Sequence, residues 1–108
     1  MIFFVDDNGF LFKPENYDNI SKIDLPSGTK VICDFAFYQG YGIKEVTLPT
    51  GLITIGENAF SQCSNLEKIN LPETLVNIES KAFSDCESLV EITLPINTDF
   101  IKELTFVN

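Results

Sequence analysis

The hydrophobic residues of the chain recur at an interval of 23 residues. The dipeptide Leu-Pro begins at Leu25, Leu48, Leu71 and Leu94. Further apolar columns keep the same register: Ile32, Ile55 and Ile78; Ala36, Ala59 and Ala82; Phe37, Phe60 and Phe83; Ile43, Leu66 and Leu89; and Val46, Ile69 and Ile92. Self-similarity at a fixed period is the signature of a repeat architecture, in which each repeat packs only on its neighbours.

Each repeat predicts one β-strand and one returning segment. Ile69 and Leu71 alternate with polar residues, which is the period of a strand, and Pro72 ends that strand because proline has no N–H to donate. In the returning segment, the small Ala59 permits close backbone approach and Phe60 fills the core. One strand per 23-residue coil, stacked at about 4.8 Å, predicts an α/β-type solenoid with four parallel strands on one face.

The two ends of the chain depart from the repeat. Two apolar runs flank the segment from Asp6 to Gly9, and an Asn-Gly pair between apolar runs indicates a β-hairpin. We therefore predict an N-terminal hairpin cap at 1–19, the repeats at 20–95, and a C-terminal cap or open edge at 96–108. An open apolar edge there would let two copies of the chain associate.

The repeat resembles the BspA-like, or Treponema pallidum-type, class of leucine-rich repeats. The second repeat carries that signature in full, with Leu48-Pro49, Ile55-Gly56, Ala59-Phe60, Cys63 and Leu66. The third repeat departs from it at Glu79, and the first at Thr29, Cys33 and Gly40. The resemblance covers residues 20–95. It implies a horseshoe-like interaction scaffold of a kind common at microbial surfaces in adhesion, and it transfers no catalytic residue.

Charge and composition narrow the classes of partner. The chain has a net charge of −9, and its seven basic residues are all lysines. Because such a chain repels phosphate and lacks arginine, the usual reader of phosphates and guanine edges, we expect no direct nucleic-acid binding. No apolar run approaches the roughly 18 residues that span a bilayer, so we expect no membrane insertion.

The residue types present disfavour catalysis and cofactor binding. The chain has no histidine, which removes the common nucleophilic triads and dyads, and carboxylates spaced along a repeat are typical of a solvated face. The segment Asp6–Gly9 lacks the ligand spacing of a calcium loop. We predict no enzyme activity, no metal site and no cofactor. Cys63 and Cys86 lie in matching positions, where buried free thiols are favoured over a disulfide with strained geometry.

Two surfaces are candidates for binding a protein partner. The outward positions of the strands form two columns, one of Lys22, Glu45, Lys68 and Glu91, the other of Asp24, Thr47, Asn70 and Thr93. Their alternating charges serve either recognition or merely the stability of neighbouring strands. The second candidate is Tyr38 and Tyr41, which replace small polar residues of the other repeats. Packing is the alternative there, with Tyr41 filling the space that Gly40 leaves in the cysteine column.

These observations favour a non-catalytic protein–protein interaction module whose partner the sequence does not identify. The alternative is a small acidic decoy that inhibits a nucleic-acid-binding target, because a chain of charge −9 would occupy a basic site electrostatically. The start of the chain has no signal-peptide pattern. We therefore expect a cytoplasmic protein if the chain is complete, and a cell-surface one if it is a fragment of a larger family member.

Overall fold

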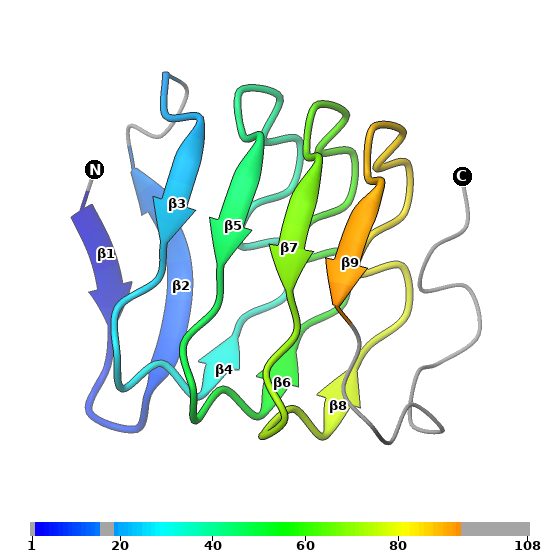
Figure 1. Cartoon of the computed structure of the whole chain (residues 1–108). Helices are drawn as coiled ribbons and strands as arrows, with labels where there is room; N and C mark the ends of the chain where they lie inside the picture. The colour runs from blue at the N-terminus through cyan, green and yellow to red at the C-terminus, as the bar shows by residue number, and fades with distance from the viewer. Residues whose placement is uncertain (1, 16–18, 94–108) are drawn as a thin grey trace.

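The computed structural model describes residues 2–15 and 19–93, which form nine β-strands in two sheets (Figure 1). The first sheet holds four strands, β3 (Lys22–Asp24), β5 (Glu45–Thr47), β7 (Lys68–Asn70) and β9 (Glu91–Thr93). The second holds β1 (Ile2–Val5), β2 (Phe10–Glu15), β4 (Val31–Ile32), β6 (Thr54–Ile55) and β8 (Asn77–Ile78). The predicted C-terminal segment at 96–108 lies outside the described residues.

The four-stranded sheet confirms the predicted parallel strands. Each strand pairs with the one 23 residues along the chain, as in Lys22 with Glu45 and Lys68 with Glu91. The middle residues Ile23, Val46 and Ile69 are buried and the residues beside them are largely exposed, because successive strand side chains point to opposite faces. The repeat therefore places one apolar residue per strand in the core.

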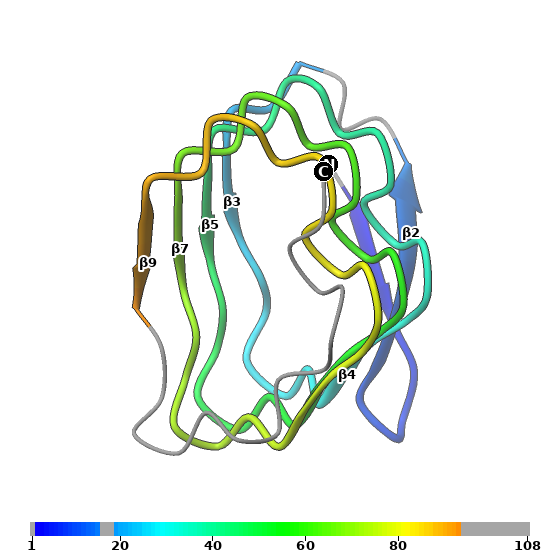
Figure 2. The ribbon, with the colours of Figure 1, turned by 90° about the vertical axis from the view of Figure 1, so that its right-hand side faces the viewer.

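The second sheet corrects the prediction of one strand per coil. After the Leu-Pro turn, each coil contributes another short strand, and β4, β6 and β8 pair in parallel in order. These strands are two residues long, which is too short for an alternation of apolar and polar residues to show in the sequence. Their sequence signal is limited to one buried isoleucine each, at Ile32, Ile55 and Ile78. Figure 2 shows the two sheets on opposite sides of the coils.

The segment that returns the chain to the first sheet is a run of turns, so the α/β class is also wrong. Backbone amides in this segment alternate between two kinds of hydrogen bond. Some bond within the coil, such as Tyr38 N–H to Phe35 O at 3.2 Å, and others bond to the next coil, such as Phe37 N–H to Ala59 O at 2.7 Å. Left-handed backbone recurs at Phe35 and Gln39, at Asn58 and Gln62, and at Lys81 and Asp85. These positions interrupt the uniform right-handed backbone that an α-helix needs. In the described part of the chain, no helix long and apolar enough to cross a membrane occurs.

The core between the sheets is a set of stacked identical side chains. The rings of Phe37 and Phe60 stack with centroids 5.1 Å apart, and those of Phe60 and Phe83 stack at 5.5 Å. The three rings are buried, as are the alanines that precede them. Small alanine beside large phenylalanine lets successive coils approach while the rings fill the interior.

The predicted N-terminal hairpin is confirmed. β1 pairs antiparallel with β2, and the Asp6 carboxylate accepts hydrogen bonds from Asn8 N–H and Phe10 N–H in the turn. Gly9 adopts a φ of +85°, and a Cβ there would lie 2.8 Å from Gly28 O, so both backbone freedom and space require glycine. β2 pairs in parallel with β4 and so joins the hairpin to the second sheet. The division at 1–19, 20–95 and 96–108 stays a prediction.

Candidate interaction surface

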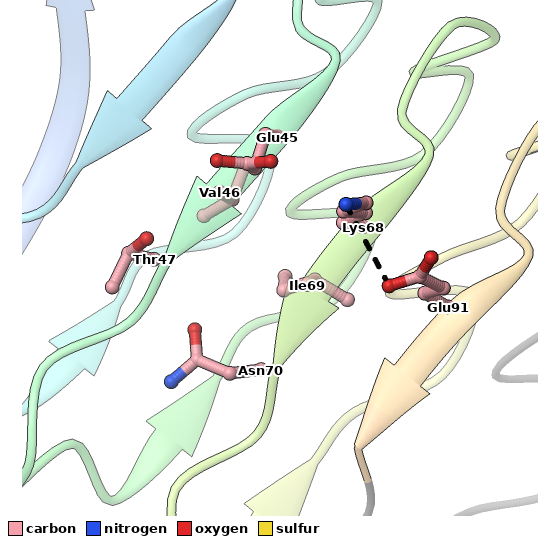
Figure 3. A pocket seen from close by; sticks show the side chains of 7 residues that line it. All are labelled: Glu45, Val46, Thr47, Lys68, Ile69, Asn70 and Glu91. Carbon is pink, nitrogen blue, oxygen red and sulfur yellow. Dashed lines mark ion pairs between the residues drawn. The ribbon is translucent and has the colours of Figure 1, made fainter.

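The first predicted column lies across the four-stranded sheet. Backbone pairing places Lys22 beside Glu45, Glu45 beside Lys68, and Lys68 beside Glu91. Figure 3 shows Glu45, Lys68 and Glu91 on three successive strands, with Lys68 directed toward Glu91. Straight columns follow from parallel pairing at a constant interval, which presents one side chain per coil at the same height.

The charges of this column fall into two separate ion pairs. Lys22 Nζ lies 3.9 Å from Glu45 Oε2, and Lys68 Nζ lies 3.8 Å from Glu91 Oε2. All four side chains are solvent-exposed, so each pair contributes at most about 1 kcal/mol of stability. The column is thus electrically balanced, with the division between the pairs falling between β5 and β7.

In the second column, Asn70 makes backbone contacts that the sequence did not predict. The Asn70 side chain accepts a hydrogen bond from Leu48 N–H at 2.8 Å and donates one to Leu48 O at 3.2 Å. The backbone pairing of β5 with β7 includes Glu45 and Val46 but not Thr47. Beyond that point, the hydrogen bonds of the Asn70 side-chain amide replace backbone pairing. Asn70 therefore secures the end of β5, while Asp24 and Thr47 are exposed and Thr93 joins the column through its backbone pairing with Asn70.

A hollow of about 300 Å³ opens on this face between the two ion pairs. Val46 and Ile69, which are themselves almost fully buried, contribute apolar surface to it. Polar side chains of both columns surround them, namely Glu45, Thr47, Lys68, Asn70 and Glu91 (Figure 3). Apolar surface flanked by charged groups of both signs suits a protein segment that carries an apolar residue beside polar ones.

Tyr38 and Tyr41 line other hollows than this one. Tyr38 is half-buried and meets the ring of Phe35 edge-on, with centroids 5.3 Å apart. Tyr41 is 52% exposed, so the alternative in which it fills the space beside Gly40 does not hold. Ile43 fills that space, because its Cδ1 lies 2.5 Å from where a Cβ on Gly40 would stand.

The comparisons with known proteins agree with the repeat fold. The family model described as the BspA type leucine rich repeat region (6 copies) matches residues 11–108. The chain belongs to the BspA-type leucine-rich repeat family. No curated protein matches it.

One solved structure, the leucine-rich repeat protein of T. pallidum, is similar to this BspA-type chain, with a TM-score of 0.77 and 27% sequence identity. The match covers 87% of this chain and 47% of that protein, so the chain spans about half the length of its structural relative. Leucine-rich repeats of this family generally mediate protein–protein interactions.

The cysteine column of the BspA-type repeat is part of the core. Cys63 and Cys86 are buried free thiols, as the sequence predicts, and their Sγ atoms lie 3.2 Å from Phe37 O and 3.1 Å from Phe60 O. Burial raises the pKa of each of these thiols to about 12. Cys33 is partly exposed, and its pKa is raised by burial and then by the carboxylates of Asp34 and Asp6. The column therefore holds neutral thiols that pack and donate weakly to the preceding coil.

Thiol reactivity tests this assignment. In the folded protein at pH 8 we expect iodoacetamide to modify Cys33 first and to leave Cys63 and Cys86 protected until urea unfolds the chain. The pKa of Cys63 and of Cys86 rises on folding, because the folded protein favours the protonated thiol. The folding stability that these thiols contribute is therefore fully present below pH 9.0, their ordinary pKa, and is lost as the pH rises toward about 12. Mass spectrometry of alkylated peptides gives the order, with Cys33→Ser as control. Modification of Cys63 as fast as Cys33 in the folded state would contradict a buried column.

The described residues hold no group of three or more Cys, Asp or Glu side chains arranged to bind a metal ion. On the strand face, Glu45 and Glu91 are each paired with a lysine of the first column. The strand face offers charge, hydrogen-bonding groups and a small apolar surface for recognition.

Proposed function

We propose that the chain is a non-catalytic protein-interaction module that binds its partner through the four-stranded sheet. The observation that carries the proposal is the hollow between β5 and β7, where Val46 and Ile69 are flanked by Lys68 and two carboxylates. The membership of the BspA-type family supports a protein as the partner.

A role in microbial adhesion, and with it a place at the cell surface, is part of the same proposal. The partner would then be a protein of a host or neighbouring cell, recognised in an extended segment. Parallel columns suit such a segment, because each successive coil presents an equivalent side chain to it. The balanced charge of the column favours a partner that itself alternates in sign, since like charges placed opposite each other are unfavourable.

The substitution Lys68→Glu tests the strand face. It would place three carboxylates side by side and remove the ion pair with Glu91, so we expect a loss of at most about 1 kcal/mol of folding stability. If the face binds the partner, affinity should fall well beyond that, mostly through slower association and a changed salt dependence. Binding to a panel of purified extracellular-matrix proteins by surface plasmon resonance measures both.

A matched control reverses the ion pair. In the double variant Lys68→Glu with Glu91→Lys, an ion pair of opposite orientation is kept, so stability should return in part, the carboxylate at position 68 still lying beside Glu45, whereas affinity should stay low. The rival surface is tested by Tyr38→Ser with Tyr41→Ser, the residues found at Ser61 and Ser64. Affinity lost only in the tyrosine variant would refute the strand-face site.

A further inference from the structure

The first coil carries aromatic residues at three positions where the next two coils are polar. Phe35, Tyr38 and Tyr41 form what we call the aromatic ridge. The equivalent residues of the second and third coils form the polar terrace, which consists of Asn58, Ser61, Ser64, Lys81, Ser84 and Glu87. Phe35 is 47% exposed and Tyr41 more so, so Phe35 adds exposed apolar surface beside the two tyrosines that the sequence singled out.

Two adjoining hollows lie where the ridge meets the terrace. One of about 390 Å³ is lined by Phe35 and Tyr38 and by terrace residues that include the buried Ser61 and Ser84. Another of about 220 Å³ is lined by Tyr41 with Ser64 and Glu87. Both hollows include Gln62 and Asp85, so they adjoin along this column. The larger one is within the range of small-molecule sites.

Tyr38, the middle residue of the ridge, is held in place by the neighbouring coil. Gln62 Nε2 donates a hydrogen bond to the Tyr38 hydroxyl at 3.3 Å, and Gln39 Nε2 donates to Gln62 Oε1 at 3.0 Å. Tyr38 also packs edge-on against Phe35. Rings fixed in this way lose little conformational freedom on binding, which favours affinity.

We propose that the aromatic ridge and the polar terrace bind a neutral oligosaccharide. A pyranose ring has a face of C–H groups, which packs against an aromatic ring, and a rim of hydroxyls, which hydrogen-bond to amides, hydroxyls and carboxylates. The hollows supply both kinds of group, with Phe35 and Tyr38 beside Asn58 and Gln62. Because the chain carries −9 and no arginine, it disfavours sialylated, sulfated or uronic-acid glycans.

A protein segment fits this surface less well. Protein interfaces concentrate affinity where apolar anchors enter pockets that are emptied of water. The rings of Phe35 and Tyr38 line only part of the larger hollow, and its remaining lining is polar: the buried serines Ser61 and Ser84, two amides and two charged side chains. Such a lining favours a ligand that is itself rich in hydroxyl groups. This site is separate from the strand face and does not rest on the function proposed above.

Nuclear magnetic resonance titration of the full ¹⁵N-labelled chain tests the proposal. The probes are cellohexaose, maltohexaose, mannohexaose and chitohexaose. We expect at least one of them to shift the side-chain amide signals of Asn58 and Gln62. The variants Phe35→Asn and Tyr38→Ser should each raise its dissociation constant at least tenfold. Both introduce the residue of the second coil, and Asn tolerates the left-handed backbone at position 35, so folding should be retained.

The controls separate this site from the strand face. Lys68→Glu should leave oligosaccharide binding unchanged, and an oligoguluronate should bind at least tenfold more weakly than the best neutral probe. The proposal is overturned if no neutral probe moves these signals, or if both ridge variants bind the sugar as the parent chain does. It is equally overturned if the ridge variants lose only a matrix protein, since the ridge would then be a protein interface.

Discussion

Replacing Phe60 with alanine should lower the free energy of unfolding by about 3–5 kcal/mol, the usual cost of removing a buried aromatic side chain. Phe60 is fully buried and stacks on both sides, with its ring centroid 5.1 Å from that of Phe37 and 5.5 Å from that of Phe83. Its removal would open a cavity in the middle of the column and break both ring contacts. Urea denaturation followed by circular dichroism measures the loss.

A second substitution at Phe60 provides a comparison for the alanine variant. Phe60→Leu keeps much of the volume and should cost less than alanine, which also covers the case in which Phe60→Ala is largely unfolded. A loss below about 1.5 kcal/mol for alanine would mean that neighbouring coils collapse into the cavity and that the stacked column contributes little beyond ordinary burial.

The second large effect is expected at Gly40, where the other repeats have cysteine. Gly40→Cys should destabilise the protein by about 1–3 kcal/mol, the usual cost of overpacking a core. A Cβ at this position would stand 2.5 Å from Ile43 Cδ1 and 3.2 Å from Phe37 O. Restoring the cysteine of the repeat therefore harms this coil, although the same residue is buried without conflict at Cys63 and Cys86.

Combining Gly40→Cys with Ile43→Leu should recover most of that loss. The double variant reproduces the Cys-x-x-Leu arrangement of Cys63 with Leu66, in which the second residue branches at Cγ rather than at Cβ. Denaturation of the single and double variants gives the coupling free energy between the two positions. Additive losses would show that Phe37 O, rather than Ile43, is what excludes a side chain at position 40.

The sequence predicts those parts of the fold that are repeated and apolar. The Ile69 column located the four-stranded sheet, and the Asn-Gly pair before Phe10 located the hairpin. The second sheet was missed because strands such as Thr54–Ile55 are too short to show a period. The returning segment was predicted, but its backbone conformation was not. Left-handed backbone occurs there at Phe35, Gln39 and other residues whose types do not indicate it.

At the candidate site, the columns were predictable and their pairing was not. A constant interval places Lys68 next to both Glu45 and Glu91, and side-chain geometry gives the ion pair to Glu91. The double hydrogen bond of Asn70 to Leu48 likewise depends on the local spacing of two strands. The aromatic ridge had a partial signal in Tyr38 and Tyr41, but the exposure of Phe35 follows from its left-handed backbone and could not be read from a list of residue types.

Hydrogen bonds between coils also give the turn segments a common electrical direction. Among the described residues, six of them run from an amide N–H of one coil to a carbonyl of the next: from Phe35 to Glu57, Phe37 to Ala59, Gln39 to Ser61, Asn58 to Ser80, Phe60 to Ala82, and Gln62 to Ser84. Aligned peptide dipoles add, as they do along an α-helix, and here the positive end points toward the third coil. That coil carries Glu79, Asp85 and Glu87 in its turn segment, whereas the corresponding segments of the first and second coils carry Asp34 and Glu57 alone. The acidic residues of these segments are thus most numerous on the third coil, toward which the dipoles of the turn segments place their positive end.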